Sequence, residues 1–468
     1  MREFLKNISY SLTANVISML VGILSVLVFP KFIGVDEFGY YQLYIFYISY
    51  VTLTAFGWAD GVYLKYGGWR FEDLPFSKLN TQFWMLALSQ GVLYMFLFLG
   101  AGQVGDYEKR CIFFVVCIGA LIVHMRYFLY LILQASNQMK AYAECIITER
   151  LFSVLGGLLA LLLGYRGYLL LIALDVAGRF LSLLIILKSC RKIVFQVPKF
   201  KREELAEAGR FMMSGSMVLF AALASSMVIG IVRYAIEAHW DITAFSKVSL
   251  TISISNMATR CINAVGIVMF PTLRRIPKEQ LQKIYGYLNC GLTVFIFGML
   301  TLYQPAAFLL KMWLPQYADS IKYAAILLPV CAYECKNVML VSAYLKTLFA
   351  DKILLLINGT SILLSLGFTI VTVFVLNSIE MAVLSMLISL MTRCILGELY
   401  LGQRLKMQMW QQVWREGLLA ALFIFCNWSL GWIGTVFYAA GFAVYCMMMR
   451  QKLRIICQFL HEKIHKKR

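Results

Sequence analysis

Residues 167–188 read GYLLLIALDVAGRFLSLLIILK, an almost uninterrupted apolar stretch. A helix of about 20 such residues spans the roughly 30 Å hydrocarbon core of a bilayer. Asp175 and Arg179 lie inside the stretch, and their spacing of four places them on one helix face, where they can form an ion pair. The stretch therefore predicts a transmembrane helix that carries its own ion pair.

Comparable stretches recur along the 468 residues, of which 61% are apolar and 14% charged. Soluble domains average about 45–50% apolar and about 25% charged residues. We place spans at residues 8–32, 40–64, 78–101, 110–134, 141–164, 167–188, 211–235, 242–270, 284–309, 318–348, 353–376, 380–402, 416–431 and 434–449. The sequence therefore predicts an all-α polytopic membrane protein with 14 transmembrane helices, or 12 if the last two short spans are discounted.

The basic residues are distributed unequally between the two sets of loops. Of the 43 Lys and Arg residues, 29 lie in one set of loops and both termini, against 7 in the opposite loops. Because basic residues accumulate on the cytoplasmic side, we expect both termini in the cytoplasm. The net charge of +19 comes from 43 basic against 24 acidic residues. Because the basic residues lie mainly in alternate loops, as in membrane proteins, we expect no nucleic-acid partner.

The longest connection between spans divides the chain. We expect a six-helix bundle, a basic cytoplasmic linker, a second six-helix bundle, an extra transmembrane hairpin and a basic cytoplasmic tail at residues 1–188, 189–210, 211–405, 406–449 and 450–468. The exits from the first and seventh spans share a small and an aromatic residue at matching positions. This favours two pseudo-symmetric bundles around a central cavity, lined by the first, second, seventh and eighth spans.

Nine ionisable residues are predicted near mid-span, six basic and three acidic. An unpaired charge at the centre of a transmembrane helix costs about 2.5–3.5 kcal/mol on insertion scales. At least three bases have no acidic partner within this set, which favours a water-filled, cation-lined cavity; packing ion pairs are the alternative. The predicted cavity cations, which would bind an anionic substrate, are Arg126, Arg150, Arg179, Arg260, Lys336 and Arg393.

Polar and small residues also follow single helix faces in two spans. They recur every three or four residues from Asn7 to Ser25 and from Ser246 to Asn263. Such stripes line an aqueous cavity or mediate close helix packing. We expect three asparagines to line the cavity, namely Asn15, Asn256 and Asn263.

Transport coupled to an ion needs a carboxylate at membrane depth. The sequence offers Glu334, Glu149 and Asp60, and we expect Asp60 near a cytoplasmic helix end, within reach of water. The sequence contains no nucleotide-binding, metal-binding or nucleophile motif, so we expect no cofactor and no enzyme activity.

Three short motifs lie at the ends of spans. Residues 29–41, FPKFIGVDEFGYY, resemble the exit from the first helix of polysaccharide transporters. Residues 57–66, GWADGVYLKY, are similar to the end of their second helix, and residues 313–317, WLPQY, to the corresponding loop of the second half. The chain thus resembles the Wzx-type polysaccharide, or O-antigen, flippases of the multidrug/oligosaccharidyl-lipid/polysaccharide exporter superfamily.

The resemblance implies a flippase that moves an undecaprenyl-diphosphate-linked oligosaccharide from the cytoplasmic to the periplasmic leaflet of the bacterial inner membrane. It also implies membrane lipids, a polysaccharide polymerase and a chain-length regulator as partners in surface polysaccharide assembly. Arginine suits such a substrate, because its guanidinium presents paired donors to phosphate oxygens.

Three alternatives stay open. One is a peptidoglycan-precursor flippase of the same superfamily. A multidrug exporter would be expected to carry an acidic residue in its first helix, and residues 8–32 contain none. A polytopic O-antigen polymerase or ligase, which is an enzyme, would be expected to have a large periplasmic loop, and no loop of that size is predicted.

Overall fold

The structure is a computed structural model that describes the backbone over residues 2–274 and 278–455, and the side chains over residues 9–10, 13–257, 259 and 280–455. All regular structure in these ranges is helical, which confirms the all-α polytopic fold. The chain divides into two compact units, Met1–Leu223 and Ala224–Arg468, and the boundary falls inside one long helix, α9 (Arg202–His239).

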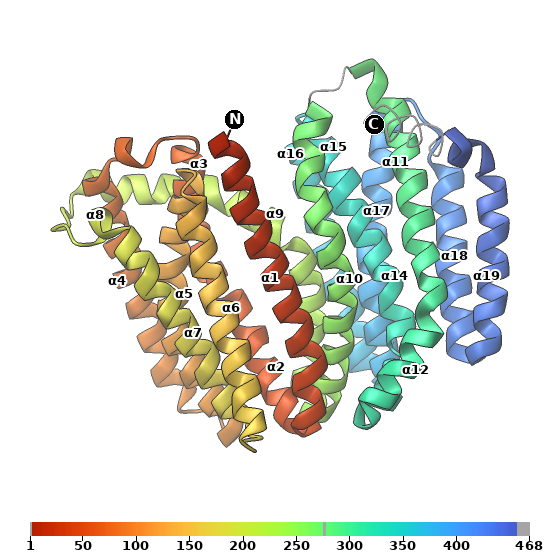
Figure 1. Ribbon diagram of the computed structural model, residues 1–468, viewed down its shortest axis with the longest axis horizontal. Helices are drawn as coiled ribbons and strands as arrows, with labels where there is room; N and C mark the ends of the chain where they lie inside the picture. Colours follow the sequence, from red (N-terminus) through yellow and green to blue (C-terminus); the bar gives the residue numbers. More distant parts are fainter. Residues whose placement is uncertain (1, 275–277, 456–468) are drawn as a thin grey trace. The chain divides into compact units, whose positions relative to one another are not determined.

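The N-terminal unit begins with the long helix α1 (Arg2–Phe32) and ends within α9 (Figure 1). Between them lie α2 (Val35–Tyr50), the 3-10 turn η1 (Val51–Ala55), α3 (Trp58–Tyr66), η2 (Phe71–Asp73), α4 (Phe76–Ala101), α5 (Tyr107–Ala135), α6 (Met139–Leu162), α7 (Tyr168–Ser189) and α8 (Arg191–Val194). α6 packs along both α1 and α7, and α4 packs along α5.

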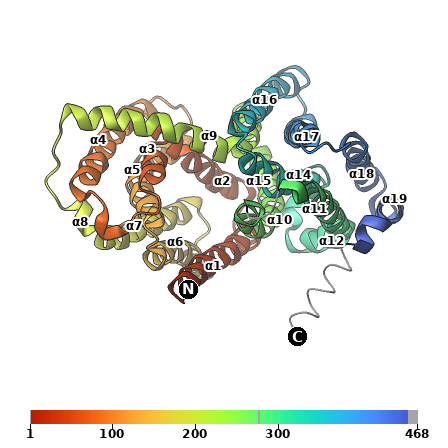
Figure 2. The ribbon, with the colours of Figure 1, turned by 90° about the horizontal axis from the view of Figure 1, so that it is seen from above.

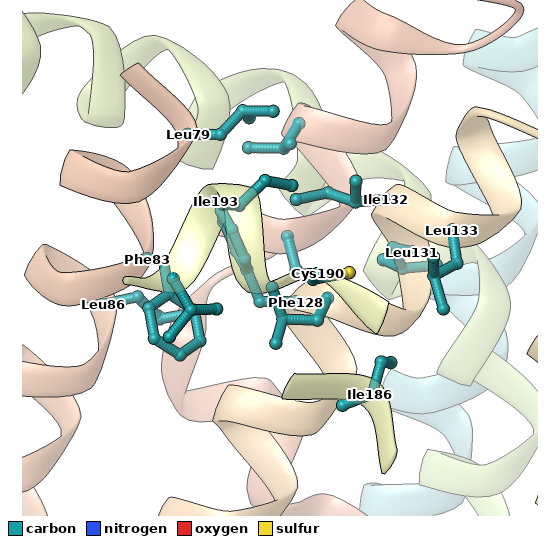
Figure 3. Packing of buried hydrophobic residues seen from close by; sticks show 14 of the residues in the cluster. Leu79, Phe83, Leu86, Phe128, Leu131, Ile132, Leu133, Ile186, Cys190 and Ile193 are labelled. Atoms are coloured by element: carbon teal, nitrogen blue, oxygen red, sulfur yellow. The ribbon is translucent and has the colours of Figure 1, made fainter. Parts of the chain in front are cut away.

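A buried apolar cluster lies where the short helix α8 meets α4, α5 and α7 (Figure 3). Phe83 of α4, Phe128 of α5 and Ile193 of α8 are fully buried in it. Asn80 Nδ2 also donates a hydrogen bond to the carbonyl of Val194 (2.9 Å). The beginning of the segment expected to be a linker is therefore packed into the N-terminal unit, because α8 carries apolar side chains on its inner face.

The second predicted span, residues 40–64, is not one continuous helix. α2 tightens into η1, and Phe56 (φ 48°) and Gly57 (φ 75°) then adopt left-handed backbone conformations before α3 begins. Glycine tolerates such a conformation, which most other residues avoid. The prediction of a single helix is therefore wrong here. Hydropathy measures only how apolar a segment is and does not reveal a local left-handed backbone conformation.

The same break brings two glycines against α9, whose first half passes α3 and α4 (Figure 2). A Cβ added at Gly61 would overlap the carbonyl of Phe211, and one at Gly215 would overlap the carbonyl of Gly57. Small residues allow helix backbones to touch in this way. The glycines of the GWADG motif therefore serve to let α3 pack closely against α9.

α9 begins at Arg202, earlier than the predicted span start at position 211. Glu203 and Glu204 lie in its first turn, where acidic residues favour a helix N-terminus. Further contacts hold this amphipathic start: Lys65 pairs with Glu207, and Gln82 Nε2 donates to the carbonyl of Glu204 (2.9 Å). A hydropathy search finds only the apolar continuation of the helix.

The C-terminal unit runs from α9 into α10 (Ile242–Arg274) and ends with α18 (Trp410–Ser429) and α19 (Gly431–Met448), a packed pair drawn in blue in Figure 1. Between them lie α11 (Lys278–Met299), η3 (Leu300–Leu302), α12 (Tyr303–Trp313), η4 (Pro315–Tyr317), α13 (Ala318–Ile321), α14 (Ala324–Lys336), the π-helical turn η5 (Asn337–Ser342), α15 (Ala343–Thr347), α16 (Asp351–Thr369), the π-helical turn η6 (Ile370–Val375) and α17 (Ile379–Arg404).

α14 is the buried axis of the C-terminal unit. It packs against α10, α11, α17 and α18, and all its residues except Leu328 are buried. This burial decides the environment of every ionisable side chain that α14 carries.

Apart from the broken second span and the early start of α9, the helices follow the predicted spans. In the described part of the chain, 11 helical segments are long and apolar enough to cross a membrane. The other predicted spans, 40–64, 242–270 and 416–431, coincide with α2–α3, α10 and α18. The chain is therefore a multi-pass membrane protein.

Candidate functional site: two buried charge clusters

The N-terminal unit contains a group of ionisable residues that we call the N-terminal charge cluster: Arg126 of α5, Glu149 and Arg150 of α6, and Asp175 and Arg179 of α7. Arg179 Nε donates to Asp175 Oδ2 at 2.6 Å, which confirms the predicted pair. Arg179 Nη1 also lies 3.6 Å from Glu149 Oε1, and Arg126 pairs with the other oxygen of Glu149. Three helices are thus joined by alternating charges.

Neutral donors and close packing hold this cluster in place. Tyr44 Oη donates to Asp175 Oδ2 (2.8 Å), and Ser153 Oγ donates to Asp175 Oδ1 (3.2 Å). A Cβ at Gly178 would lie 2.9 Å from both the carbonyl oxygen of Glu149 and Ser153 Oγ, so α6 and α7 approach closely here. The buried carboxylate of Asp175 is therefore fully coordinated by its own unit.

Arg150 differs from the other members because its side chain is exposed. It lies near the middle of α6, where an exposed charge facing hydrocarbon is costly. The exposed apolar residues of α6, such as Leu155 and Leu159, follow another face. Arg150 and Leu159 are nine positions apart, which corresponds to about 180° around a helix with 3.6 residues per turn. Arg150 therefore faces away from the lipid-compatible side of α6.

The C-terminal unit contains a second group, which we call the C-terminal triad: Lys336 of α14, Glu398 of α17 and Glu416 of α18. Lys336 Nζ lies 2.6 Å from Glu398 Oε1 and also pairs with Glu416. The three residues are 0%, 1% and 1% exposed. The triad combines one base with two acids in a fully buried position.

Neutral side chains surround the two carboxylates. Asn289 Nδ2 donates to Glu398 (3.3 Å), while Thr293 Oγ1 and Gln412 Nε2 donate to Glu416 at 2.9 and 3.1 Å. Both acids lie near the ends of apolar stretches, where a charge costs little free energy. For this reason neither was among the predicted mid-span residues. Lys336 therefore pairs with two acids that are not among the nine predicted mid-span residues.

A third arrangement joins Arg393 of α17 and Glu334 of α14. Arg393 Nη1 lies 3.4 Å from Glu334 Oε1 and also donates to Ser225 Oγ, while its Nε donates to Asn358 Oδ1 (2.8 Å). Glu334 and Lys336, although two positions apart, therefore pair with different residues: Glu334 with Arg393 of α17, and Lys336 with Glu398 of α17 and Glu416 of α18. Four of the six predicted cavity cations, Arg126, Arg179, Lys336 and Arg393, are thus paired inside their own unit.

Asp60, the third predicted coupling residue, lies in α3 and is 7% exposed. Its Oδ1 accepts a hydrogen bond from Tyr127 Oη (3.1 Å). The expectation that water reaches Asp60 is therefore wrong, because α3 is packed against α5 and α9.

The polar stripes behave differently along their length. Asn15 of α1 is exposed and Asn256 of α10 is partly buried. Ser246 and Ser249, at the start of the α10 stripe, are fully buried, and Ser249 Oγ accepts from Arg233 Nη2 (3.0 Å). The first part of the α10 stripe is therefore buried against neighbouring helices and does not line a cavity. The remaining predicted residues of α10, Arg260 and Asn263, have side chains outside the described residues.

One polar network was not anticipated from the sequence. Thr54 Oγ1 donates to Gln90 Oε1 (2.8 Å) and lies 3.2 Å from Tyr94 Oη and 3.1 Å from His124 Nε2. A pocket of about 370 Å³, lined by Thr54, Tyr94 and mainly apolar residues, lies beside it. The residues come from η1, α4 and α5, and no periodicity links them along the chain.

No protein-family model matches the chain, and no curated protein matches it. A solved structure of a multidrug resistance MATE family transporter of the MOP superfamily, in an inward-facing conformation, is 14% identical over 84% of this chain and 98% of its own, with a TM-score of 0.62. The lipid II flippase MurJ, in an inward closed conformation, is 13% identical over 95% of this chain and 100% of its own, with a TM-score of 0.61. At these identities the likeness concerns the fold, and the chain is a multi-pass membrane protein with the fold of these two transporters.

Proposed function

We propose that the chain is a transporter that flips an undecaprenyl-diphosphate-linked oligosaccharide from the cytoplasmic to the periplasmic leaflet of the bacterial inner membrane. The observation that supports this most directly is Arg150, an exposed cation near the middle of α6. With three arginines and two carboxylates, the N-terminal charge cluster carries an excess positive charge. Such a site suits an anionic head group in an aqueous cavity, because arginine presents paired donors to phosphate oxygens.

The six predicted cations receive different roles in this proposal. Arg150 contacts the diphosphate from α6. Arg260 keeps its predicted role as a cavity cation of α10, and its side chain lies outside the described residues. Arg126 and Arg179 hold the N-terminal charge cluster together and keep its potential positive. Lys336 and Arg393 would reach an anion only by releasing their carboxylate partners.

The three predicted asparagines are proposed to contact the glycan or its diphosphate. Asn15 supports this role because it is exposed on α1, which packs along α6, the helix that carries Arg150. Asn256 and Asn263 are proposed to act with Arg260 on α10.

Ion coupling remains part of the proposal. Glu149 and Glu334 are paired with arginines, and Asp60 accepts a hydrogen bond from Tyr127. Each would take up an ion only if its partner moved away during the transport cycle. A polysaccharide polymerase and a chain-length regulator are the proposed protein partners, and both termini are proposed to lie in the cytoplasm.

The second candidate is a peptidoglycan-precursor flippase. The likeness to the lipid II flippase MurJ favours it, because that likeness extends over 95% of this chain, against 84% for the MATE transporter. Export of cationic drugs is less well supported, since residues 8–32 contain no acid and the exposed charge near the middle of α6, Arg150, is positive.

The experiment is a flipping assay on full-length protein in proteoliposomes, with an undecaprenyl-diphosphate-linked oligosaccharide. Arg150→Ala should weaken substrate binding roughly 10- to 100-fold, because a hydrogen bond to a charged group contributes about 1.5–3 kcal/mol. Arg150→Lys should retain part of the affinity. Arg166→Ala, in the exposed connection between α6 and α7, is the matched control and should bind normally. Equal binding by Arg150→Ala and wild type would contradict the proposal.

A further inference from the structure

The charge balance of the C-terminal triad is unusual for a buried site. Lys336 supplies one positive charge, while Glu398 and Glu416 supply two carboxyl groups, and all three are at most 1% exposed. A buried net charge is strongly unfavourable, and two carboxylates that share one site disfavour simultaneous ionisation. The triad is neutral when one carboxyl group holds a proton.

In the described part of the chain, no second cation pairs with the triad. The ionisable groups around the triad, by helix, are Tyr285 and Cys290 on α11, Tyr333 and Glu334 on α14, Cys394 on α17 and Tyr445 on α19. Arg393 pairs with Glu334, and Lys452, beyond α19, is near Cys290 and is not fully buried. Among the described residues, no base other than Lys336 forms an ion pair with the two acids.

Several buried polar atoms around the triad have no hydrogen-bond partner among the described residues. Asn289 donates to Glu398, yet its Oδ1 is unpaired although the residue is 0% exposed. The hydroxyl groups of Tyr285 and Tyr333, which lie within electrostatic range of both glutamates, are also unpaired. Unsatisfied buried groups are rare in native structures. They supply acceptors for a protonated carboxyl group and partners for a water molecule that delivers the proton.

We infer that water approaches the triad from the connection between α17 and α18. A pocket of about 460 Å³ there is lined by residues that include Gln403, Gln408 and Gln411. The next residue, Gln412, donates to Glu416 (3.1 Å). Each glutamate lies six positions from the helix end at this connection, which corresponds to about 9 Å of helix.

The π-helical turn η5 follows Lys336 directly, and such turns often occur at functional sites.

We propose that Lys336, Glu398 and Glu416 form a proton-binding site that carries one exchangeable proton. The proton binds a carboxylate oxygen of Glu398 or Glu416, and the ammonium group of Lys336 neutralises the other carboxylate. Release returns the proton to water through the α17–α18 pocket and leaves both carboxylates ionised beside Lys336. If the proposed transport function holds, this proton couples flipping to a proton gradient.

The test is an infrared titration of carboxyl groups in the full-length protein, reconstituted in liposomes without any lipid-linked substrate. Wild type should show one more buried protonated carboxyl group than either triad variant, and this group should lose its proton as the pH is raised. Glu398→Gln and Glu416→Gln should each abolish this signal, because either change leaves a neutral pair with Lys336. Glu334→Gln is the matched control: it removes a buried carboxylate with its own arginine, and the signal should persist.

Absence of a protonated carboxyl group in wild type would overturn the proposal, whatever the folding of the variants. So would a signal that survives both triad substitutions or that sodium removes at constant pH. The titration needs no substrate, so a triad that titrates in a protein without flipping activity would contradict only the proposed function. Flipping by wild type without a titrating carboxyl group would contradict only the proton site. With both in place, a pH gradient should accelerate flipping by wild type and not by Glu398→Gln.

Discussion

The N-terminal charge cluster and the C-terminal triad both hold ionisable residues within transmembrane helices, but their surplus charges have opposite signs and different exposure. The cluster has more bases than acids, and its surplus cation, Arg150, is exposed. The triad has more acids than bases, and all its members are buried. A surplus charge in a membrane protein must reach water or be neutralised by a bound ion. This comparison is the reason why we propose an anionic substrate for the N-terminal unit and a proton for the C-terminal unit.

The largest expected effect comes from removing the single base of the triad. Lys336→Met leaves two buried carboxyl groups without a cation, and breaking a buried pair in this way costs about 3–5 kcal/mol of unfolding free energy. Arg126→Met should cost less, because Glu149 keeps Arg179 at 3.6 Å. Thermal unfolding of both variants in detergent measures the difference. Equal losses would contradict the distinction between the two regions.

The same variant gives a pH dependence with a definite sign. In Lys336→Met the unfolded state exposes Glu398 and Glu416 to water, whereas the folded state holds them buried and disfavours their charge. The folded state therefore binds protons more readily, and the variant should recover stability as the pH falls. Thermal unfolding over an acidic to alkaline series tests this. A deficit that grows towards acidic pH would contradict the account.

A smaller effect is expected where packing rather than charge holds the N-terminal charge cluster. Gly178→Ala places a methyl group 2.9 Å from the carbonyl oxygen of Glu149, and overpacking of this kind costs about 1–3 kcal/mol. Gly156→Ala, at the same helix pair, meets only the end of the Leu174 side chain at 3.2 Å and should be tolerated better. Comparable melting temperatures for the two variants would show that α6 and α7 can separate without loss.

The smallest stability effect should follow from changing the exposed member of the cluster. Arg150 forms no ion pair with the described residues, so Arg150→Gln should alter the unfolding free energy by no more than about 0.5 kcal/mol, as surface substitutions usually do. Thermal unfolding beside wild type measures it. A loss as large as that of Lys336→Met would show that Arg150 stabilises the unit, and would weaken its assignment to the substrate.

Hydropathy and charge distribution were sufficient to predict the helical spans, because apolar composition determines which segments cross a membrane. The pair between Asp175 and Arg179 was predictable because both residues lie on one helix face. The break at Gly57 was not, since it depends on the contact between α3 and α9. The triad was not predictable either, because Lys336, Glu398 and Glu416 come from three helices that only tertiary packing brings together.

The central claim is that Arg150 faces water at membrane depth. The direct measurement is labelling of Arg150→Cys in intact membranes with a charged, membrane-impermeant thiol reagent, with the wild-type protein as background. Leu159→Cys is the matched control, because Leu159 is 59% exposed on the opposite, apolar face of α6. The account predicts rapid labelling at position 150 and slow labelling at position 159. Equally slow labelling at both positions would place Arg150 against lipid or protein and contradict the claim.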